Sequence, residues 1–305
     1  MRTSTRNSKA AAAPTSASAP PIAPRPFLKW AGGKGQLLRE LLARLPERFA
    51  TYHEPFVGGG ALFFALVGRG MISRAVLSDA NGPLIDTYLA VRDRVDDVIA
   101  ALGHHPNEAA HFYRVRALDP DDLSLAEKAA RVIFLNRTCY NGLHRENRAG
   151  QFNVPFGRYT NPRICDDVNL RACSRALRDV EVLRADFTTV LDRAKPGDLV
   201  YFDPPYHPVS KTASFTAYDR NGFDEMDQAS LRDVFAELAR QGVQVVLSNS
   251  ATPLVRRLFR GFRVERVLAR RAINSKGERR GRVAEVIVAS GNSAGEVGRR
   301  HRVHA

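Results

Sequence analysis

A four-residue motif, Asp203-Pro204-Pro205-Tyr206, places a carboxylate, a backbone carbonyl and an aromatic ring next to one another. It directly follows an apolar run at 199–202, which predicts a buried strand. Neither proline can continue a strand, because proline has no N–H to donate. We therefore expect a stiff turn at the carboxyl end of a strand, the edge at which α/β sheets bind ligands. Two acceptors beside an aromatic face suit a planar heterocycle with an exocyclic amino group, although a plain Pro-rich turn gives the same four residues.

A glycine-rich turn follows Phe56 and precedes a predicted helix that begins at Ala61. Gly58 and Gly60 would let a ligand approach the backbone closely. Asp79 ends a predicted strand about 20 residues later, the spacing at which an acidic side chain takes ribose hydroxyls. The pattern indicates a nucleoside-cofactor site but departs from Gly-x-Gly-x-x-Gly, which weakens the case for a dinucleotide. A purely structural turn is the alternative.

Trp30 and Lys34 lie in a second glycine-containing segment. The segment is similar to a phosphate-binding loop, but that loop needs glycine where Leu28 stands and Ser or Thr where Gly35 stands. The only tryptophan of the chain, beside a lysine in a glycine turn, could instead hold an amino-acid carboxylate. For Trp30 alone, a core tryptophan that caps a helix is equally consistent.

Residues 134–163 combine arginines, asparagines and aromatic residues and carry a net charge of +4. Arg and Asn side chains read guanine and adenine edges with paired hydrogen bonds, and aromatic rings can wedge or stack. Glycines at 142, 150 and 157 predict a hairpin with tight turns. A solvated basic loop is the alternative. A second basic block at 256–282 has few aromatics and suits sequence-independent phosphate contact.

The composition is that of an ordinary globular protein, with 305 residues of which 44% are hydrophobic and 26% charged. We expect no membrane span, no secretory signal, reduced cysteines and no metal site, because the corresponding sequence patterns are missing. Of the net charge of +14, the segments 1–26 and 291–305 carry +4 and +2, which leaves +8 on residues 27–290. A body this basic favours a polyanionic partner, most simply nucleic acid, over an Arg-rich protein without one.

Predicted strands and helices alternate along the chain. Strands are expected at 75–78, 182–184, 199–202, 243–247 and 284–288, and helices at 36–45, from 61, at 84–102 and at 228–240. The alternation predicts an α/β fold with a doubly wound, parallel sheet. Residues 90–165 break the rhythm and predict an inserted second domain, mainly helical with a β-hairpin. Residues 27–89 and 166–290 would then form one domain, and the tails 1–26 and 291–305 are expected to be disordered.

Assembled, these pieces give a chain that resembles the Dam-type DNA adenine-N6 methyltransferases of the D12 class over most of residues 27–289. The tetrad is shared with other amino-group methyltransferases, whereas the block at 140–159 is more specific to this family. In chain order the resemblance is carried by Phe27-Leu-Lys-Trp-Ala-Gly-Gly-Lys34, Glu54-Pro-Phe-Val-Gly-Gly-Gly60, Ser78-Asp-Ala-Asn81, Tyr140-Asn-Gly-Leu143, Phe152-Asn-Val-Pro-Phe-Gly-Arg-Tyr159 and Asp203-Pro-Pro-Tyr206.

The resemblance implies a Rossmann-like methyltransferase core that uses S-adenosylmethionine as methyl donor. Trp30 and Lys34 would line the methionine end of the donor, and Asp79 would take its ribose hydroxyls. Residues 56–60 would cradle the donor. In the tetrad, Asp203 and Pro204 would accept hydrogen bonds from the target amino group, and Tyr206 would stack on a flipped adenine.

By the same likeness, the inserted domain would recognise double-stranded DNA at the palindrome GATC, with Arg145 as the guanine contact. Cys139, His144 and residues 146–148 lie where we expect variation, and Glu146 bears on the fine specificity. We expect a monomer in the bacterial cytoplasm, associated with the nucleoid. The sequence is consistent both with an enzyme that acts alone and with one that has a companion restriction endonuclease. The positions that the family uses for recognition are Tyr140, Asn141, Leu143, Arg145, Asn147, Pro155 and Arg158.

Three other functions compete with this interpretation. An RNA adenine methyltransferase could share the tetrad, but the major groove of A-form RNA is too narrow for the basic hairpin to read. A glutamine-modifying protein methyltransferase would carry Asn in place of Asp203. A non-catalytic DNA-binding module would require a damaged pocket, whereas Trp30, Lys34, Asp79 and Tyr206 are all present.

Overall fold

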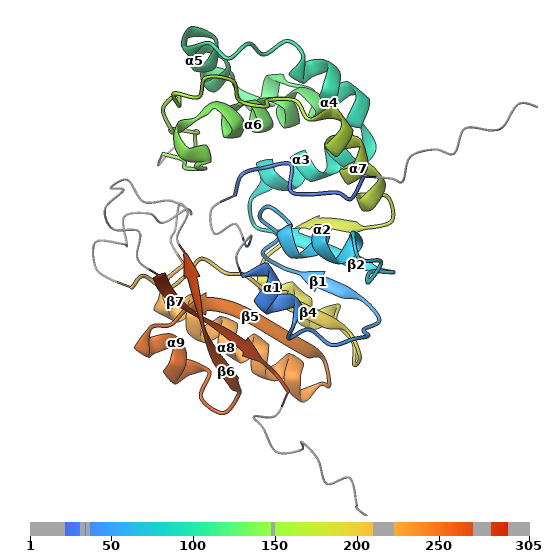
Figure 1. Ribbon diagram of the computed structural model, residues 1–305, viewed down its shortest axis with the longest axis vertical. Coiled ribbons are helices and arrows are strands. Elements are labelled where there is room, and N and C mark those ends of the chain that lie inside the picture. The colour runs from blue at the N-terminus through green and yellow to red at the C-terminus, as the bar shows by residue number, and fades with distance from the viewer. Residues whose placement is uncertain are drawn as a thin grey trace, which may run out of the picture.

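The computed structural model describes residues 22–30, 34, 37–147, 150–209, 223–270 and 282–291. Most of the two expected disordered tails lies outside these residues, as do Gly32, Gly33 and part of the basic block at 256–282. Figure 1 shows a sheet with a stack of helices on one side, which extends away from the sheet, and a further helical layer around α8 and α9.

Within the described residues, seven strands form one sheet in the order β3-β2-β1-β4-β5-β7-β6. The neighbours from β3 to β5 pair in parallel, and β7 pairs antiparallel with both β5 and β6. The expected α/β fold with a Rossmann-like core is confirmed, and the strand order reverses at β1 and β4, where such sheets bind ligands. The strands are β1 (Tyr52–Glu54), β2 (Ala75–Asp79), β3 (Glu181–Arg184), β4 (Leu199–Phe202), β5 (Gln244–Ser250), β6 (Arg263–Arg270) and β7 (Arg282–Ala289).

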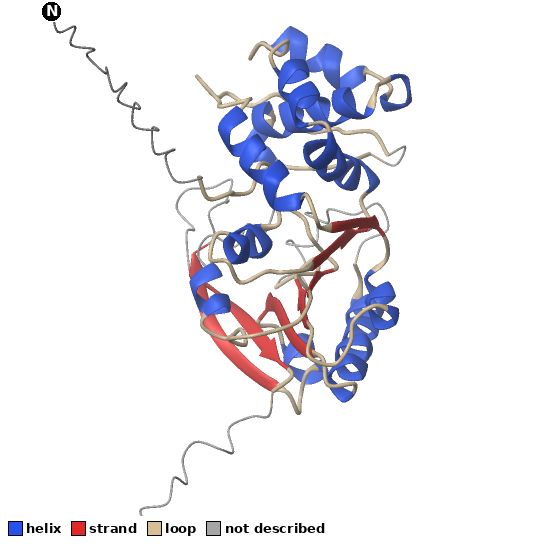
Figure 2. Ribbon diagram, turned by 90° about the vertical axis from the view of Figure 1, so that its right-hand side faces the viewer, coloured by secondary structure: helices blue, strands red, loops and turns tan. Residues whose placement is uncertain are grey.

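Alternate residues of the central strands bury their side chains on opposite faces of the sheet, as the pleat requires. On β4, Tyr201 packs in one apolar cluster with α1, α2, α3, α6 and α7, whereas Val200 and Phe202 pack in the other with α8 and α9. The helices are α1 (Leu38–Leu42), α2 (Ala61–Val67), α3 (Gly82–Asp93), α4 (Val95–Leu102), α5 (Ala109–Ala117), α6 (Leu125–Thr138), α7 (Asp167–Leu177), α8 (Glu225–Arg240) and α9 (Pro253–Leu258). Figure 2 shows helices on both sides of the sheet.

Several elements differ from the sequence prediction. The sheet was expected to be parallel, but β7 pairs antiparallel with both β5 and β6. The helix expected at 84–102 is two helices, because Arg94 leaves helical geometry with φ −137° and ψ 35°. The break lets both α3 and α4 pack against α6. The helix expected at 36–45 is shorter in the structure and spans Leu38–Leu42. Strand β1 was not predicted because its three residues are too few to show a period, and β6 was not because its arginines read as a phosphate-binding surface.

The helices α4, α5 and α6 form the core of the predicted inserted domain. Helices α4 and α6 pack against α3, α5 packs against α6, and α7 packs against both α3 and α4. The predicted boundary at 90 falls inside α3, which therefore runs from the sheet layer into the inserted region. The assignment of 90–165 as a separate recognition domain stays a prediction.

A buried carboxylate ties together the amino-terminal ends of β1 and β4. Asp198 is 4% exposed and accepts hydrogen bonds from the backbone N–H groups of Thr51 and Lys195, both at 2.9 Å. Its second oxygen also lies 3.1 Å from Nε2 of His53. These bonds fix the loops at the edge of the sheet opposite the tetrad.

We expect the substitution Asp198→Ala to lower the free energy of unfolding by about 3 kcal/mol, because it leaves buried backbone donors without an acceptor. Urea unfolding followed by circular dichroism measures this change. Asp121→Ala is the control, since the Asp121 side chain is 96% exposed. Equal stability of the two variants would contradict the structural role of Asp198.

Candidate active site

Asp203 stands directly after β4, at the end of the sheet where the strand order reverses. Its Oδ1 lies 2.5 Å from the Lys34 ammonium and accepts a hydrogen bond of 3.0 Å from the Ser248 hydroxyl. Within the described part of the chain, no donor reaches Oδ2 of Asp203, and 22% of this side chain remains exposed. The carboxylate is thus anchored through Oδ1, and Oδ2 has no donor among the described residues.

Lys34 joins two members of the tetrad. Its ammonium also donates to the Tyr206 hydroxyl at 2.8 Å and lies 4.4 Å from the centre of the Tyr206 ring. Tyr206 in turn donates to Glu285 of β7 at 3.1 Å. Burial lowers the pKa of Lys34, but the Asp203 carboxylate and the Tyr206 hydroxyl outweigh it, so that the pKa lies above its ordinary value and the lysine stays charged. The structure therefore brings Lys34, Asp203 and Tyr206 together.

The two prolines of the tetrad present their carbonyl groups differently. Among the described residues, none donates a hydrogen bond to the Pro204 carbonyl, whereas the Pro205 carbonyl accepts one of 3.0 Å from Gln228. Pro204 is buried and Pro205 is partly exposed. Oδ2 of Asp203 and the carbonyl oxygen of the adjacent Pro204 are therefore two acceptors of the tetrad that no described residue engages.

The glycine turn packs against Trp30. Gly58 has φ +46°, and a Cβ atom there would lie 2.7 Å from Cδ1 of Trp30, so a larger residue would push the indole away. The Gly58 N–H donates to Oδ2 of Asp79 at 3.2 Å, and the Asn81 N–H donates to Oδ1 at 3.0 Å. Trp30, Gly58 and Asp79 consequently form one surface at the carboxyl ends of β1 and β2.

Gly60 and Phe56 flank this surface. Gly60, with φ +63°, forms the left-handed cap from which α2 starts. Phe56 stacks on Phe187 with ring centres 5.4 Å apart and meets Phe223 edge-on at 5.7 Å. Sequence reasoning missed Phe187, which follows β3 in the same way that the tetrad follows β4. This apolar wall lies beside the carboxyl ends of the parallel strands.

Two buried asparagines hold the segment that leads to Trp30. Asn136 of α6 accepts from the Lys29 N–H and donates to the Lys29 carbonyl, both at 2.7 Å. Asn169 of α7 makes the same pair of bonds with Arg25, at 3.1 and 2.9 Å. Asn136 also donates to the Gly142 carbonyl at 3.3 Å. The Asn136 side chain thus connects the segment that leads to Trp30 with the turn that carries candidate DNA contacts.

Several candidate DNA contacts surround one surface hollow of about 540 Å³. It is lined by Tyr140, Asn141, Arg158, Phe156, Gly157 and Tyr159. Tyr140 is 46% exposed, and Asn141 has φ +57°, a backbone conformation that is uncommon for residues other than glycine and concentrates at functional sites. Lys29, which sequence reasoning did not select, places its ammonium 4.3 Å from the centre of the Tyr159 ring.

The other candidate DNA contacts lie on a narrow hairpin. Arg145 is exposed, and its guanidinium donates to Asn153 Oδ1 at 2.7 Å, while the Asn153 N–H donates to the Arg145 carbonyl at 2.9 Å. Asn147 and Gln151 bond across the turn, with 2.8 Å between the Asn147 N–H and the Gln151 carbonyl oxygen. The predicted hairpin therefore exists as isolated bridges rather than as a regular ladder.

Leu143 and Pro155 contribute backbone groups to the base of this region. The Leu143 carbonyl accepts from the Cys139 thiol at 3.2 Å, and the Pro155 carbonyl accepts from the Tyr140 N–H at 2.8 Å. Pro155 is exposed, whereas Leu143 is partly buried. Two of the candidate contacts thus also fix the fold of the surface that carries them.

Polar residues at the end of β5 were missed by sequence reasoning. Ser248, Asn249 and Ser250 follow an apolar stretch and are all fully or almost fully buried. Polar side chains at the carboxyl end of a buried parallel strand indicate a binding site, because packing in the core alone would favour apolar side chains there. Glu285 gave no comparable signal, because its position opposite the tetrad depends on the pairing of β7 with β5.

Glu54 adds a buried titratable group beneath the site. It ends β1, is 3% exposed and accepts a hydrogen bond of 2.9 Å from Tyr52. Burial raises the pKa of Glu54 to about 8, against the opposing Tyr52 bond and with a further rise from the charge of Asp203. At neutral pH the carboxyl is therefore largely protonated, which avoids a second negative charge next to Asp203.

The described residues contain no group of three or more His, Cys, Asp or Glu side chains that could hold a metal ion. In that part of the chain, no helix is long and apolar enough to cross a membrane. All three cysteines, Cys139, Cys165 and Cys173, are free thiols.

The sequence is similar to known proteins across nearly this whole site. Residues 30–273 match the model of a family described as D12 class N6 adenine-specific DNA methyltransferase. The type II methyltransferase M1.LlaDCHI of Lactococcus lactis subsp. cremoris is 40% identical over 272 residues, which cover 87% of this chain and 94% of that protein. The type II methyltransferase M.MjaIII of Methanocaldococcus jannaschii is 39% identical over 274 residues, 84% and 95% of the two chains. A DNA adenine methylase of Salmonella typhi is 35% identical over 267 residues, 86% and 94% of the two chains.

The raised pKa of Glu54 predicts a pH dependence of stability. The folded chain keeps this proton up to about pH 8, whereas the unfolded chain releases it near 4.5, so the folded state binds more protons between these values. The stabilisation is thus complete below pH 4.5 and is lost as the pH rises to 8, on the order of 5 kcal/mol in all. The Glu54→Gln variant should lack this slope in urea unfolding between pH 5 and 9, a range of about four units.

Glu47→Gln supplies the control, because Glu47 is exposed on the surface and its loss should leave the slope unchanged. If the wild type and Glu54→Gln lost stability in parallel over this range, Glu54 would not be the buried proton carrier.

Proposed function

The chain belongs to the D12 class of N6 adenine-specific DNA methyltransferases, and from this premise we propose that it transfers a methyl group from S-adenosylmethionine to adenine N6 in double-stranded DNA at GATC. The observation that carries the proposal is that Asp203 Oδ2 and the adjacent Pro204 carbonyl, at the carboxyl end of β4, are acceptors that no described residue engages. These two acceptors match the two N–H groups of an exocyclic amine.

The residues around the glycine turn fit S-adenosylmethionine. Gly58 keeps the backbone close to Trp30 with no Cβ between them, and the Asp79 carboxylate is held at the strand end where ribose hydroxyls need an acceptor. The aromatic wall of Phe56 and Phe187 suits an adenine ring. When bound, the donor supplies an electrophilic methyl group on a sulfonium.

The tetrad would activate the target nitrogen through hydrogen bonds. The lone pair of an adenine amino group is delocalised into the ring, which makes the nitrogen a poor nucleophile. Acceptance of both N–H groups by Asp203 and Pro204 favours a pyramidal nitrogen and exposes the lone pair. As positive charge builds on nitrogen during transfer, the Asp203 carboxylate stabilises it in a site that is shielded from water. The step is direct, so it requires neither a Cys nor a Ser nucleophile.

Lys34 would keep Asp203 in the state that this step needs. Burial raises the pKa of Asp203, and the Lys34 ammonium at 2.5 Å and the Ser248 hydroxyl oppose that rise. A protonated Asp203 would carry an O–H donor on one oxygen and could no longer accept hydrogen bonds freely through both oxygens. Tyr206, held by Lys34 and Glu285, would present its ring to the adenine.

The target base must leave the duplex to reach these acceptors, which costs a few kcal/mol of stacking and pairing. The hollow at Tyr140, Asn141 and Arg158 and the hairpin at Arg145 would bind the flanking base pairs. In this proposal residues 90–165 are the target-recognition domain, and 27–89 with 166–290 the catalytic domain. The enzyme would act as a cytoplasmic monomer without a metal ion.

Methyl transfer is tested with tritiated S-adenosylmethionine and a duplex that contains one GATC site, beside duplexes altered at each of the four bases and an RNA of the same sequence. We expect label only in the intact duplex, located on adenine N6. Label in DNA without GATC would retain the reaction and reject the site. Label confined to RNA, or none in any nucleic acid, would reject the proposal.

Asp203→Asn should reduce kcat by at least about 100-fold, because the variant loses the charge that stabilises the developing cation. Duplex binding, measured by fluorescence anisotropy, should stay within about twofold, since the recognition residues are untouched. A melting curve accompanies the assay, because the substitution leaves the buried Lys34 without its counter-ion. Loss of DNA binding in a folded variant would contradict this division of roles.

Arg145→Ala should relax discrimination at one guanine of the site by about 1–3 kcal/mol, the value of one bidentate base contact. The ratio of kcat/KM on GATC and on single-base variants measures it. Arg240→Ala, which removes an exposed arginine at the end of α8, is the matched control. An unchanged site preference in the Arg145 variant would remove this residue from the recognition set.

A further inference from the structure

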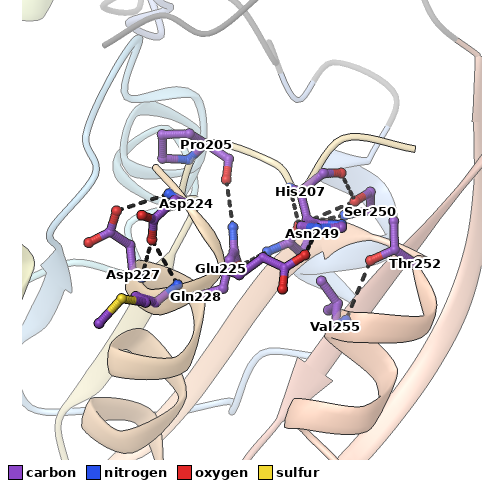
Figure 3. A network of polar contacts seen from close by, with 11 residues as sticks. Pro205, His207, Asp224, Glu225, Asp227, Gln228, Asn249, Ser250, Thr252 and Val255 are labelled. Carbon is purple, nitrogen blue, oxygen red and sulfur yellow. Dashed lines mark hydrogen bonds and ion pairs between the residues drawn. The ribbon is translucent and has the colours of Figure 1, made fainter. Parts of the chain in front are cut away.

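The turn of the tetrad is held by side chains from outside it. Gln228, in the first turns of α8, is fully buried, and its Nε2 donates to the Pro205 carbonyl at 3.0 Å. Asn249 of β5, also fully buried, accepts a hydrogen bond of 3.1 Å from the His207 N–H. The Ser250 hydroxyl donates to the His207 carbonyl. Figure 3 shows these contacts as a band from α8 across the turn to β5.

The two amides form a chain with one direction. Oδ1 of Asn249 accepts from the backbone N–H groups of His207 and Ser250, the latter at 2.8 Å, and a backbone N–H can only donate. Nδ2 of Asn249 must therefore be its donor, and it bonds to Oε1 of Gln228 at 2.9 Å. This leaves Nε2 of Gln228 to face the Pro205 carbonyl. The backbone around β5 thus dictates which end of the Gln228 amide meets the turn.

We propose that Gln228, oriented by Asn249, is a positioning residue that fixes the Asp203–Tyr206 turn for methyl transfer. This inference rests on the proposed function. By engaging the Pro205 carbonyl, Gln228 fixes the peptide group between Pro205 and Tyr206. Because the ring of Pro205 already fixes its φ, this hold also orients the preceding peptide group, so that the Pro204 carbonyl faces the target amine beside Asp203. An apolar side chain of similar size would fill the same space but could not select which carbonyl the pocket presents.

The test compares the kcat of Gln228→Glu, Gln228→Leu and the wild type on the GATC duplex from pH 6 to 9, about three units, with the full-length chain. A protonated carboxyl can donate to the Pro205 carbonyl as the amide does, whereas a carboxylate repels it. Burial raises the pKa of a carboxyl, which brings this change into the measured range. The glutamate variant should therefore recover activity as the pH falls, and the leucine variant should stay low throughout.

Expected magnitudes follow from the cost of a misplaced reacting group. Both variants should lose about 100-fold in kcat at pH 9, and Gln228→Glu should regain at least about tenfold of it by pH 6. Affinities for S-adenosylmethionine and duplex should stay within about twofold, because no binding group is removed. The pH profile of kcat for each variant is divided by that of the wild type. This division cancels the effect of titratable groups that all the proteins share. At the tetrad these groups are Asp203, Lys34, Tyr206 and Glu285, and around the start of α8 they are Asp224, Glu225, Asp227 and His207.

Gln241→Glu is the matched control, since it places the same new charge at the far end of the same helix, where Gln241 bonds to Glu237. It should follow the wild type at every pH. If Gln228→Glu fails to fold, as a melting curve would reveal, Asn249→Asp replaces it, because only a protonated carboxyl there can donate to Gln228.

The outcomes separate two failures. Two results would overturn the positioning role alone, provided that the wild type is active. One is full activity of the Gln228 variants. The other is an equal loss of kcat in the glutamate and leucine variants, without recovery at low pH. A wild type that methylates no nucleic acid would refute the proposed function and the positioning role with it. Loss of donor or duplex binding in a folded Gln228 variant would also overturn the inference.

Discussion

The ion pair between Lys34 and Asp203 is the interaction on which the site depends. A carboxylate buried at the end of β4 would tend to take up a proton, and an ammonium that is 5% exposed would tend to lose one. With the two groups 2.5 Å apart, Lys34 stays charged because its pKa is raised, and its ammonium opposes the rise that burial causes in the pKa of Asp203. The pair sets two structural requirements. The segment that carries Lys34 must reach the centre of the sheet and be held there. A second carboxyl nearby, that of Glu54, must stay protonated.

That requirement explains why the amino-terminal segment is bound so firmly. Its described residues 22–30 precede α1 and lie in no strand, so their backbone groups need partners from elsewhere. Asn136 and Asn169 supply them from α6 and α7, with paired bonds that mimic a strand neighbour. Because α6 leads directly into the turn at Tyr140–Gly142, the helix that anchors the segment before Trp30 also supports the turn that carries candidate DNA contacts.

The carboxyl ends of the parallel strands hold an unusual amount of buried polarity. Ser248, Asn249 and Ser250 interrupt the apolar pattern of β5, yet each is hydrogen-bonded, so the cost of burial is offset. The result is a polar frame around the tetrad in which the Pro205 carbonyl is engaged and the Pro204 carbonyl has no donor among the described residues. Rigid placement of acceptors is what lets a site stabilise charge at the moment it forms.

The local pattern of the sequence was sufficient to place the tetrad after a strand, the glycine turn before a helix and Asp79 at the next strand end, because turns, strand ends and short apolar runs are encoded by neighbouring residues. It also indicated the alternating α/β order and the basic hairpin. The pairing of Lys34 with Asp203, the entry of Glu285 from an antiparallel strand, and the hold of Gln228 on Pro205 depend on contacts between segments far apart in the chain. Strand order and helix packing decide those contacts, and no local period records them, so only the tertiary structure determined which acceptors the pocket presents.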